Sequence, residues 1–278
     1  MFKKLKAFTM AEVLITVGII GVVAAMTIPT LNSNVNAHQN AVALKKISAS
    51  LTDKFRAQMA AEGVDVVGDL QAFVNSSTKE QLMKEFADFL PFAGGLEGGY
   101  QHKVLGLNGK VPTDTNLIIN PWPSESTRKM TNGAFLNIFS YEQNGKMMTQ
   151  ESQNPVALRN MGSSLLYRYG IFYIDVNGYA KPNRLGYDIF KFYLGQDGML
   201  YPVGGVEVAR YHVGVNDILY DKTDYQKYNC ILGNTESWGF GCAGRVEDND
   251  WSINYLSMNS LHSSNTGGIS STGGGLTF

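Results

Sequence analysis

The sequence has few cysteines and few charges, and neither sign of charge prevails. Two cysteines among 278 residues are too few for a scaffold built on disulfides or for a four-thiolate zinc site. Charged residues make up 17% of the chain, against roughly 25% in an average soluble domain. The 23 Lys and Arg residues nearly balance the 24 Asp and Glu residues. Bulk charge therefore gives no case for nucleic acid as a partner, because nucleic-acid-binding domains are usually basic.

Common catalytic motifs are also missing. The chain contains neither an H-E-x-x-H zinc motif nor a G-x-S-x-G nucleophile motif. Gly239, Gly241 and Gly244 formally spell G-x-G-x-x-G. However, no buried strand is predicted before them, and the residues after them do not predict the apolar-faced helix that a dinucleotide site requires. We therefore expect a protein that is not an enzyme and that requires no cofactor.

What the sequence does have is one long apolar segment near its N-terminus. Lysines 3, 4 and 6 precede it, and the 24 residues of 8–31 contain a single charge, Glu12. At about 1.5 Å per helical residue they span about 36 Å, enough to cross a hydrocarbon core of about 30 Å. The lysines favour a cytoplasmic N-terminus, with the rest of the chain outside. A secretory signal peptide or a plain anchor are the alternatives, and neither needs a costly carboxylate in its apolar span.

The residues around Glu12 carry a family resemblance. The segment KAFTMAEVLITVGIIGVVAAMTIP resembles the N-terminus of type IV pilins and type II secretion pseudopilins, the prepilin family. The resemblance implies a leader at 1–7, cleavage between Ala7 and Phe8 by a prepilin peptidase, N-methylation of Phe8, and Glu12 as fifth residue of the mature chain. Pro29 lies where many members have a helix-kinking proline. Ala7 replaces the usual glycine, and because alanine is also small we expect cleavage to survive.

The resemblance also implies a function and a set of partners. It implies a subunit of a type IV pilus or a type II secretion filament, anchored in the bacterial inner membrane with its head in the periplasm or outside. The implied partners are the lipid bilayer, prepilin peptidase, an inner-membrane assembly platform, and pilin-like subunits, copies of itself included, packed through the N-terminal helix. Glu12 would pair with the Phe8 amine of a neighbouring subunit, because an unpaired buried charge is costly. The alternative is a secreted or membrane-anchored binding protein or hydrolase with a prepilin-like N-terminus.

Periodicity predicts that one helix continues beyond the apolar segment. Residues 8–31 are the predicted transmembrane helix, and Pro29 should kink or loosen it near the membrane exit. Over 32–63 an amphipathic continuation is predicted, with Gly63 as its C-terminal cap. Its apolar positions recur at steps of three and four: Leu44, Ile47, Leu51, Phe55 and Met59.

The remainder of the chain predicts an insertion, a β-rich head and a tail. Residues 64–132 are predicted as helix and loop, with Ser77 and Glu80 forming a capping box. Residues 133–262 form the head, and 263–278 are a Ser/Gly-rich tail. Strands are predicted over 134–142, 166–176 and 187–195, which are rich in aromatic and apolar residues and separated by turn residues. The predicted fold class is α+β, a long helix packed on an antiparallel sheet, as in the pilin-like fold.

Asp175, Asn177, Asn183 and Asp188 lie in one predicted loop and have two interpretations. Closely spaced carboxylate and amide oxygens suit Ca²⁺, which takes six to eight oxygen ligands, and some pseudopilins bind calcium in such loops. The resemblance thus favours a calcium site at Asp175, Asn177 and Asp188. The other interpretation is a tight turn in which Asn and Asp side chains satisfy the loop backbone. The spacing lacks the Gly and the closing Glu of an EF-hand loop.

Cys230 and Cys242 are twelve residues apart in the predicted head. Disulfides persist outside the cytoplasm, and the topology argued above places these cysteines there. Pilin-like proteins often close a C-terminal loop with such a bridge, so the resemblance favours a disulfide over two free thiols. In the chain-entropy model a bridge of this length stabilises the fold by roughly 3 kcal/mol.

Overall fold

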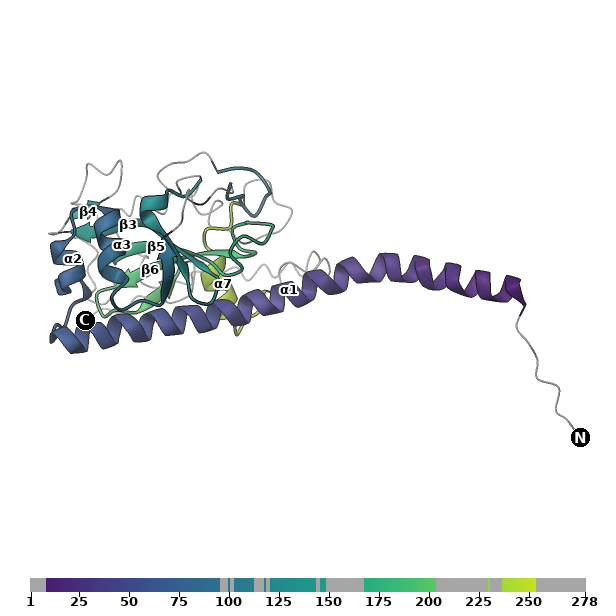
Figure 1. Ribbon diagram of the computed structural model, residues 1–278, viewed down its shortest axis with the longest axis horizontal. Helices are drawn as coiled ribbons and strands as arrows, with labels where there is room; N and C mark the ends of the chain where they lie inside the picture. Colours follow the sequence, from purple (N-terminus) through teal and green to yellow (C-terminus); the bar gives the residue numbers. More distant parts are fainter. Residues whose placement is uncertain are drawn as a thin grey trace, which may run out of the picture.

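A computed structural model describes residues 9–95, 100, 103–112, 118, 121–143, 146–148, 168–203, 230 and 237–253. One helix, α1 (Met10–Glu62), accounts for 53 of them, and at about 1.5 Å per residue it is about 80 Å long. Figure 1 shows the rest of the fold lying along the C-terminal part of α1, while the N-terminal part extends away from it. The predicted processing residues Ala7 and Phe8 and the predicted tail lie outside the described residues.

The C-terminal part of α1, residues 37–62, is amphipathic, and we call it the docked part. It packs on the described residues between 64 and 253, which together we call the head. The side chains of Leu44, Ile47, Leu51, Phe55 and Met59 are all buried, which confirms the apolar face predicted from their spacing. Gly63 ends the helix with a positive φ of 69° and donates its N–H to the Met59 carbonyl. This left-handed cap is the ending that glycine favours, and it was predicted from the sequence.

Seven described strands form one antiparallel sheet, in the order β1-β2-β3-β5-β6-β7 with β4 paired to β3. Strands β3, β5 and β6 were predicted from their aromatic and apolar alternation. The sheet is larger than predicted, because β1 and β2 lie in the range expected to hold only helix and loop. The strands are β1 (Phe92–Gly95), β2 (Thr127–Met130), β3 (Phe135–Gln143), β4 (Lys146–Met148), β5 (Arg168–Asp175), β6 (Ile189–Gly195) and β7 (Leu200–Pro202).

Both faces of the central strands are buried. In β5, Phe172 and Ile174 belong to the core cluster that includes the α1 face, whereas Tyr173 belongs to a second cluster with Tyr100 and Trp122. Alternating side chains point to opposite sides of a sheet, so the two clusters occupy its two faces. The burial of every residue of β6 follows from the same arrangement. The fold is therefore α+β, with α1 covering one face of an antiparallel sheet.

Short helices complete the head. They are η1 (Val67–Asp69), α2 (Gln71–Asn75), α3 (Lys79–Phe86), η2 (Ser124–Ser126) and α7 (Cys242–Asp248). The predicted capping box of α3 is wrong by one residue. Its N-cap is Thr78, whose hydroxyl accepts from the Gln81 N–H at 3.2 Å, while the Gln81 side chain accepts from the Ser77 N–H at 2.8 Å. Phe86 of α3 then packs edge-on to Phe55 of α1 at 5.3 Å between ring centroids.

Candidate functional site

The N-terminal part of α1 presents apolar side chains that are exposed among the described residues. Residues 10–28 form a helix long and apolar enough to cross a membrane, and none of that stretch is buried. Leu14 is 67% exposed and Ile20 is 65% exposed. At about 1.5 Å per residue the 19 residues cover about 28 Å, close to the thickness of a hydrocarbon core. We call residues 10–28 the projecting segment.

Polar side chains within the projecting segment are satisfied by its own backbone. Thr16 donates its hydroxyl to the Glu12 carbonyl at 2.9 Å, and Thr27 donates to the Val23 carbonyl at 3.0 Å. Such bonds to the preceding turn remove the cost of placing a hydroxyl in an apolar solvent. The threonines therefore do not prevent the segment from lying in lipid.

Glu12 closes the N-terminus of α1 together with Thr9. The Glu12 carboxylate accepts from the Thr9 N–H and from the Thr9 hydroxyl, both at 2.9 Å. The Thr9 hydroxyl in turn accepts from the Glu12 N–H at 3.2 Å. This is a reciprocal capping box, which satisfies backbone donors that the first turn of a helix leaves without partners. Sequence reasoning assigned Glu12 only to an intermolecular pair and overlooked this intramolecular bond, although T-x-x-E is visible in the sequence.

α1 continues without interruption through Pro29. Figure 1 shows the helix curving gently rather than breaking between its projecting and docked parts. The side chain of Pro29 lies outside the described side chains. The helix axis therefore connects the projecting segment directly to the head.

The predicted loop residues do come together in the connection between β5 and β6. The Asp175 carboxylate accepts from the Asn177 N–H at 3.2 Å and from the Gly178 N–H at 3.0 Å. It also accepts from the hydroxyl of Tyr100, which lies 75 residues earlier in the chain. Tyr100 is a member of this cluster that sequence reasoning missed, because nothing local links it to the loop.

Asp188 forms the second half of this cluster. Its carboxylate accepts from the Asn183 N–H at 2.8 Å, from the Asn177 side-chain amide at 3.2 Å, and from the Arg184 N–H. We call Asp175, Asn177, Asn183, Asp188 and Tyr100 the β5–β6 cluster. Both of its carboxylates are fully buried.

Burial sets the ionisation of the β5–β6 cluster. Loss of hydration raises the pKa of Asp188 from 3.8 to about 6, against the lowering effect of the hydrogen bonds that it accepts from Arg184, Asn183 and Asn177. Burial also raises the pKa of Asp175, and the charge of Asp188 raises it further. The pKa of the Tyr100 phenol is raised by burial and by the charge of Asp175. Tyr100 therefore stays a hydrogen-bond donor at neutral pH.

The β5–β6 cluster satisfies its carboxylates with backbone and side-chain donors of the chain itself. This is the arrangement expected from the turn interpretation. No group of three or more His, Cys, Asp or Glu side chains that could hold a metal is found among the described residues. One amide oxygen, Asn177 Oδ1, is buried without a hydrogen-bond partner. The calcium site at Asp175, Asn177 and Asp188 stays a prediction.

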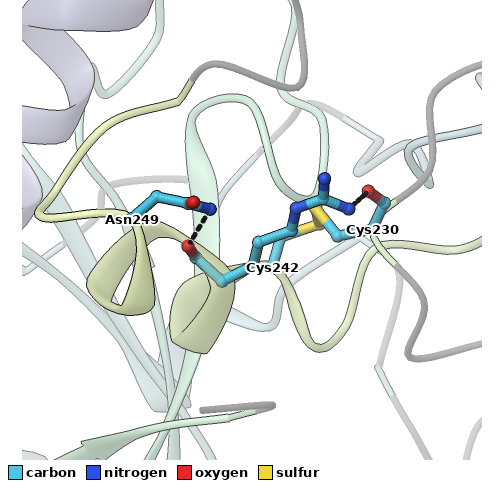
Figure 2. Close-up of a disulfide and its surroundings, with 4 residues drawn as sticks. Cys230, Cys242 and Asn249 are labelled. Carbon is cyan, nitrogen blue, oxygen red and sulfur yellow. Dashed lines mark hydrogen bonds between the residues drawn. A yellow bond between two sulfur atoms is a disulfide. The ribbon is translucent and has the colours of Figure 1, made fainter. Parts of the chain in front are cut away.

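The two cysteines form the predicted disulfide, which lies in the core. Cys230 and Cys242 are bonded with their Cα atoms 5.2 Å apart, and both side chains are buried. Figure 2 shows the bridge at the start of α7. The Arg245 side chain donates to the carbonyl of Cys230. That bond is 2.6 Å long, and Asn249 donates to the Arg245 carbonyl at 2.7 Å. Both cysteines are therefore attached to α7, because Cys242 is its first residue and its Arg245 binds the Cys230 carbonyl.

The helix α7 corrects one expectation about the glycine-rich segment. The residues after Gly244 did not predict an apolar-faced helix, yet α7 begins at Cys242, with Gly241 as its N-cap, and runs to Asp248. Gly239 adopts a positive φ of 81°, which leads the chain into the helix. The seven-residue helix buries Ala243 and Val246, and no strand precedes it in residues 237–241. A dinucleotide site lacks that strand-turn-helix context.

Comparison with protein-family models, with curated proteins and with solved structures gives no match.

Proposed function

We propose that this chain is a pilin-like or pseudopilin subunit, which prepilin peptidase processes and which assembles through α1 into a type IV pilus or a type II secretion filament. The observation that carries the proposal is the division of α1. One continuous helix has an exposed apolar part of membrane length and a second part docked on an antiparallel sheet. Such an element joins a lipid-soluble stem rigidly to a folded head.

The exposed apolar side chains support assembly as well as anchoring. In the bilayer they contact lipid at little cost, and in a filament they would contact the same segment of other subunits. Without either cover, the apolar stretch would be far more exposed surface than soluble monomers tolerate. Before assembly lipid would cover the segment, and in the filament the same segment of other subunits would cover it.

Glu12 suits a role in assembly because it is the only formal charge between Met10 and Leu44. In the single chain its carboxylate is occupied by Thr9. Cleavage before Phe8 would create a cationic amine one residue from Thr9, and a neighbouring amine of the same kind would reach Glu12 in a packed filament. The charge would then fix the axial register, because a slip by one turn leaves both groups unpaired.

The N-terminus of the membrane-bound protein tests the proposal most directly. The full chain is produced with and without a prepilin peptidase, and the N-terminal residue is determined by mass spectrometry. With the peptidase we expect an N-terminal, methylated Phe8, and without it a chain that keeps residues 1–7. The variant Ala7→Leu should keep its leader in both cases. A cut after Ala25 or beyond would contradict the proposal and indicate a secreted binding protein or hydrolase.

The assembly role of Glu12 needs its own experiment. Glu12→Ala should leave membrane insertion unchanged and lower incorporation into filaments, because the amine of the neighbour loses its partner. The measurement compares the membrane and filament fractions of the variant with those of Leu14→Ala, which removes an exposed apolar side chain nearby. Normal incorporation of Glu12→Ala would rule out the proposed role.

A further inference from the structure

The short stretch of α1 that first meets the head differs from the rest of the docked helix. Ala37 is the first buried side chain of α1 among those that the structure describes, and Asn40, Ala41 and Leu44 follow. Lys45 and Lys46 on the same stretch are exposed. We call residues 37–46 the junction segment, since it is where α1 leaves the head.

Two segments of the head reach the junction segment. The Asn40 side-chain amide donates to the Tyr187 carbonyl in the connection between β5 and β6, at 3.0 Å. The ammonium of Lys45 lies 5.9 Å from the centre of the Trp251 ring, within the range of a cation–π contact. Trp251 itself packs against the main core cluster. The junction segment is therefore held at two points five residues apart.

Both of these segments are connected to Cys242, the first by a contact and the second along the chain. Gly186 directly precedes Tyr187, and a methyl group added to it would lie 2.5 Å from Cys242 Sγ. The loop thus rests against the disulfide, with no space between them for a side chain. Trp251 follows α7, whose first residue is Cys242. Cys242 therefore lies against the loop of the first anchor and begins the helix that leads to the second.

The remainder of docked α1 is held without the disulfide. The Thr52 hydroxyl accepts from the Leu200 N–H of β7 at 3.1 Å. Phe55 stacks on Phe172 of β5 at 6.1 Å and meets Phe86 of α3 edge-on at 5.3 Å. These contacts lie on β7, β5 and α3, none of which contains Cys230 or Cys242.

We propose that the Cys230–Cys242 disulfide is a redox-dependent lock on the junction segment, which holds residues 37–46 against the head only in the oxidised protein. The lock closes when the two thiols each lose a proton and together transfer two electrons to the disulfide of a thiol–disulfide oxidoreductase, which is reduced to a dithiol. Because both sulfurs are buried, the closed bridge is protected from exchange. The direction in which α1 leaves the head is thereby fixed only after the head has reached an oxidising compartment.

Trypsin provides the test, because its cleavage sites fall on both parts of the docked helix. Lys45 and Lys46 lie in the junction segment, whereas Lys54 and Arg56 lie beyond it, and all four side chains are exposed. In the full chain in detergent micelles, Cys230→Ala/Cys242→Ala should raise cleavage after Lys45 and Lys46 by about tenfold, since cleavage follows the population of the locally open form. Cleavage after Lys54 and Arg56 should change little. An equal rise at all four bonds, or no rise, would overturn the proposal.

A second variant tests the contact between Asn40 and the loop of Tyr187 while the disulfide is intact. Asn40→Ala removes the bond to the Tyr187 carbonyl and should raise cleavage after Lys45 and Lys46, by less than the double cysteine variant. Gln39→Ala, on an exposed neighbouring position, is the matched control and should have no effect. When Asn40→Ala is added to the cysteine-free chain, we expect no further rise, because the segment is already released. If Asn40→Ala raised cleavage in the cysteine-free chain as much as it does in the chain with the disulfide, the proposal that Asn40 acts through Cys242 would be contradicted.

Discussion

The two parts of α1 belong to one helix but meet opposite surroundings. In the docked part, Leu44, Leu51 and Phe55 are completely buried. In the projecting segment, Leu14 and Ile20, although equally apolar, are about two-thirds exposed. The difference lies in the polar residues between the apolar ones. The docked part has a hydrated face made of Lys45, Lys46, Asp53, Lys54 and Arg56. After Glu12 the projecting segment has no charged residue, and Thr16 and Thr27 are its only polar side chains.

This difference teaches where the stability of each part comes from. The docked part gains free energy by burying one face against the sheet and α3, so its substitutions should affect unfolding of the head. The projecting segment is exposed in the part of the chain that the structure describes, so its substitutions should affect unfolding of the head little. Its stability as a helix depends on backbone hydrogen bonds, on the Thr9–Glu12 cap and on an apolar solvent.

The largest contrast is expected between Phe55→Ala and Leu14→Ala. Phe55 is fully buried against three phenylalanines, so its truncation should lower the free energy of unfolding of the head by about 3–5 kcal/mol. Leu14→Ala should change it by less than about 0.5 kcal/mol. Denaturant unfolding of both variants in micelles, followed by tyrosine and tryptophan fluorescence, gives the measurement. Comparable losses in the two variants would mean that the projecting segment packs on the head.

A pH titration should also distinguish the head from the projecting segment, with a smaller expected change in the free energy of unfolding. The pKa of Asp188 is raised by burial from 3.8 to about 6, so protonation favours the folded head. This contribution, about 2–3 kcal/mol from the size of the shift, is complete below about pH 4 and is lost as pH rises through about 6. Asp175 acts in the same direction, because its pKa is also raised.

Unfolding of the head measured between pH 3.5 and pH 7.5 checks this prediction. Asp188→Asn should flatten the rise in stability at low pH, while the helicity of the projecting segment should not follow the titration. A rise in stability with increasing pH, abolished by the same variant, would contradict the assignment. Repeating the titration with Ca²⁺ also tests the calcium interpretation, because a bound cation would stabilise the ionised carboxylates and reverse the dependence.

The smallest expected effect concerns the cap of the projecting segment. Thr9→Ala removes the hydroxyl that accepts from the Glu12 N–H and should destabilise the first turn by about 1 kcal/mol. Thr9→Ser keeps the hydroxyl and serves as the control. Amide exchange of the first turn, measured by NMR in micelles, should increase only in the alanine variant. An equal increase in both variants would show that the methyl group, rather than the hydroxyl, carries the effect.

Sequence reasoning succeeded where one local pattern dominates. The face of α1 and its end at Gly63 follow from a period of 3.6 residues and from the freedom of glycine at positive φ. Strands β3, β5 and β6 were found because their large apolar side chains alternate between two buried faces. β1 was missed because two of its four residues, Gly94 and Gly95, are glycines, which are depleted in strands.

Other features depend on distant parts of the chain or on a choice between equivalent patterns. Ser77–Glu80 and Thr78–Gln81 both match the capping-box pattern, and the sequence does not distinguish them, whereas the structure has the second. Tyr100 joins the β5–β6 cluster through tertiary packing. The contact between Asn40 and Tyr187 spans 147 residues, so no local signal could reveal it.

The continuity of α1 has a mechanical consequence. Between the end of the projecting segment at Ile28 and Ala37, the first buried side chain among those that the structure describes, nine residues of helix rise by about 13 Å. With residues 10–28 in a bilayer, as proposed, the head would stand off from the hydrocarbon edge on a stiff rod instead of a flexible tether. A pull or a twist applied to the projecting segment inside the membrane would then be transmitted directly to the head.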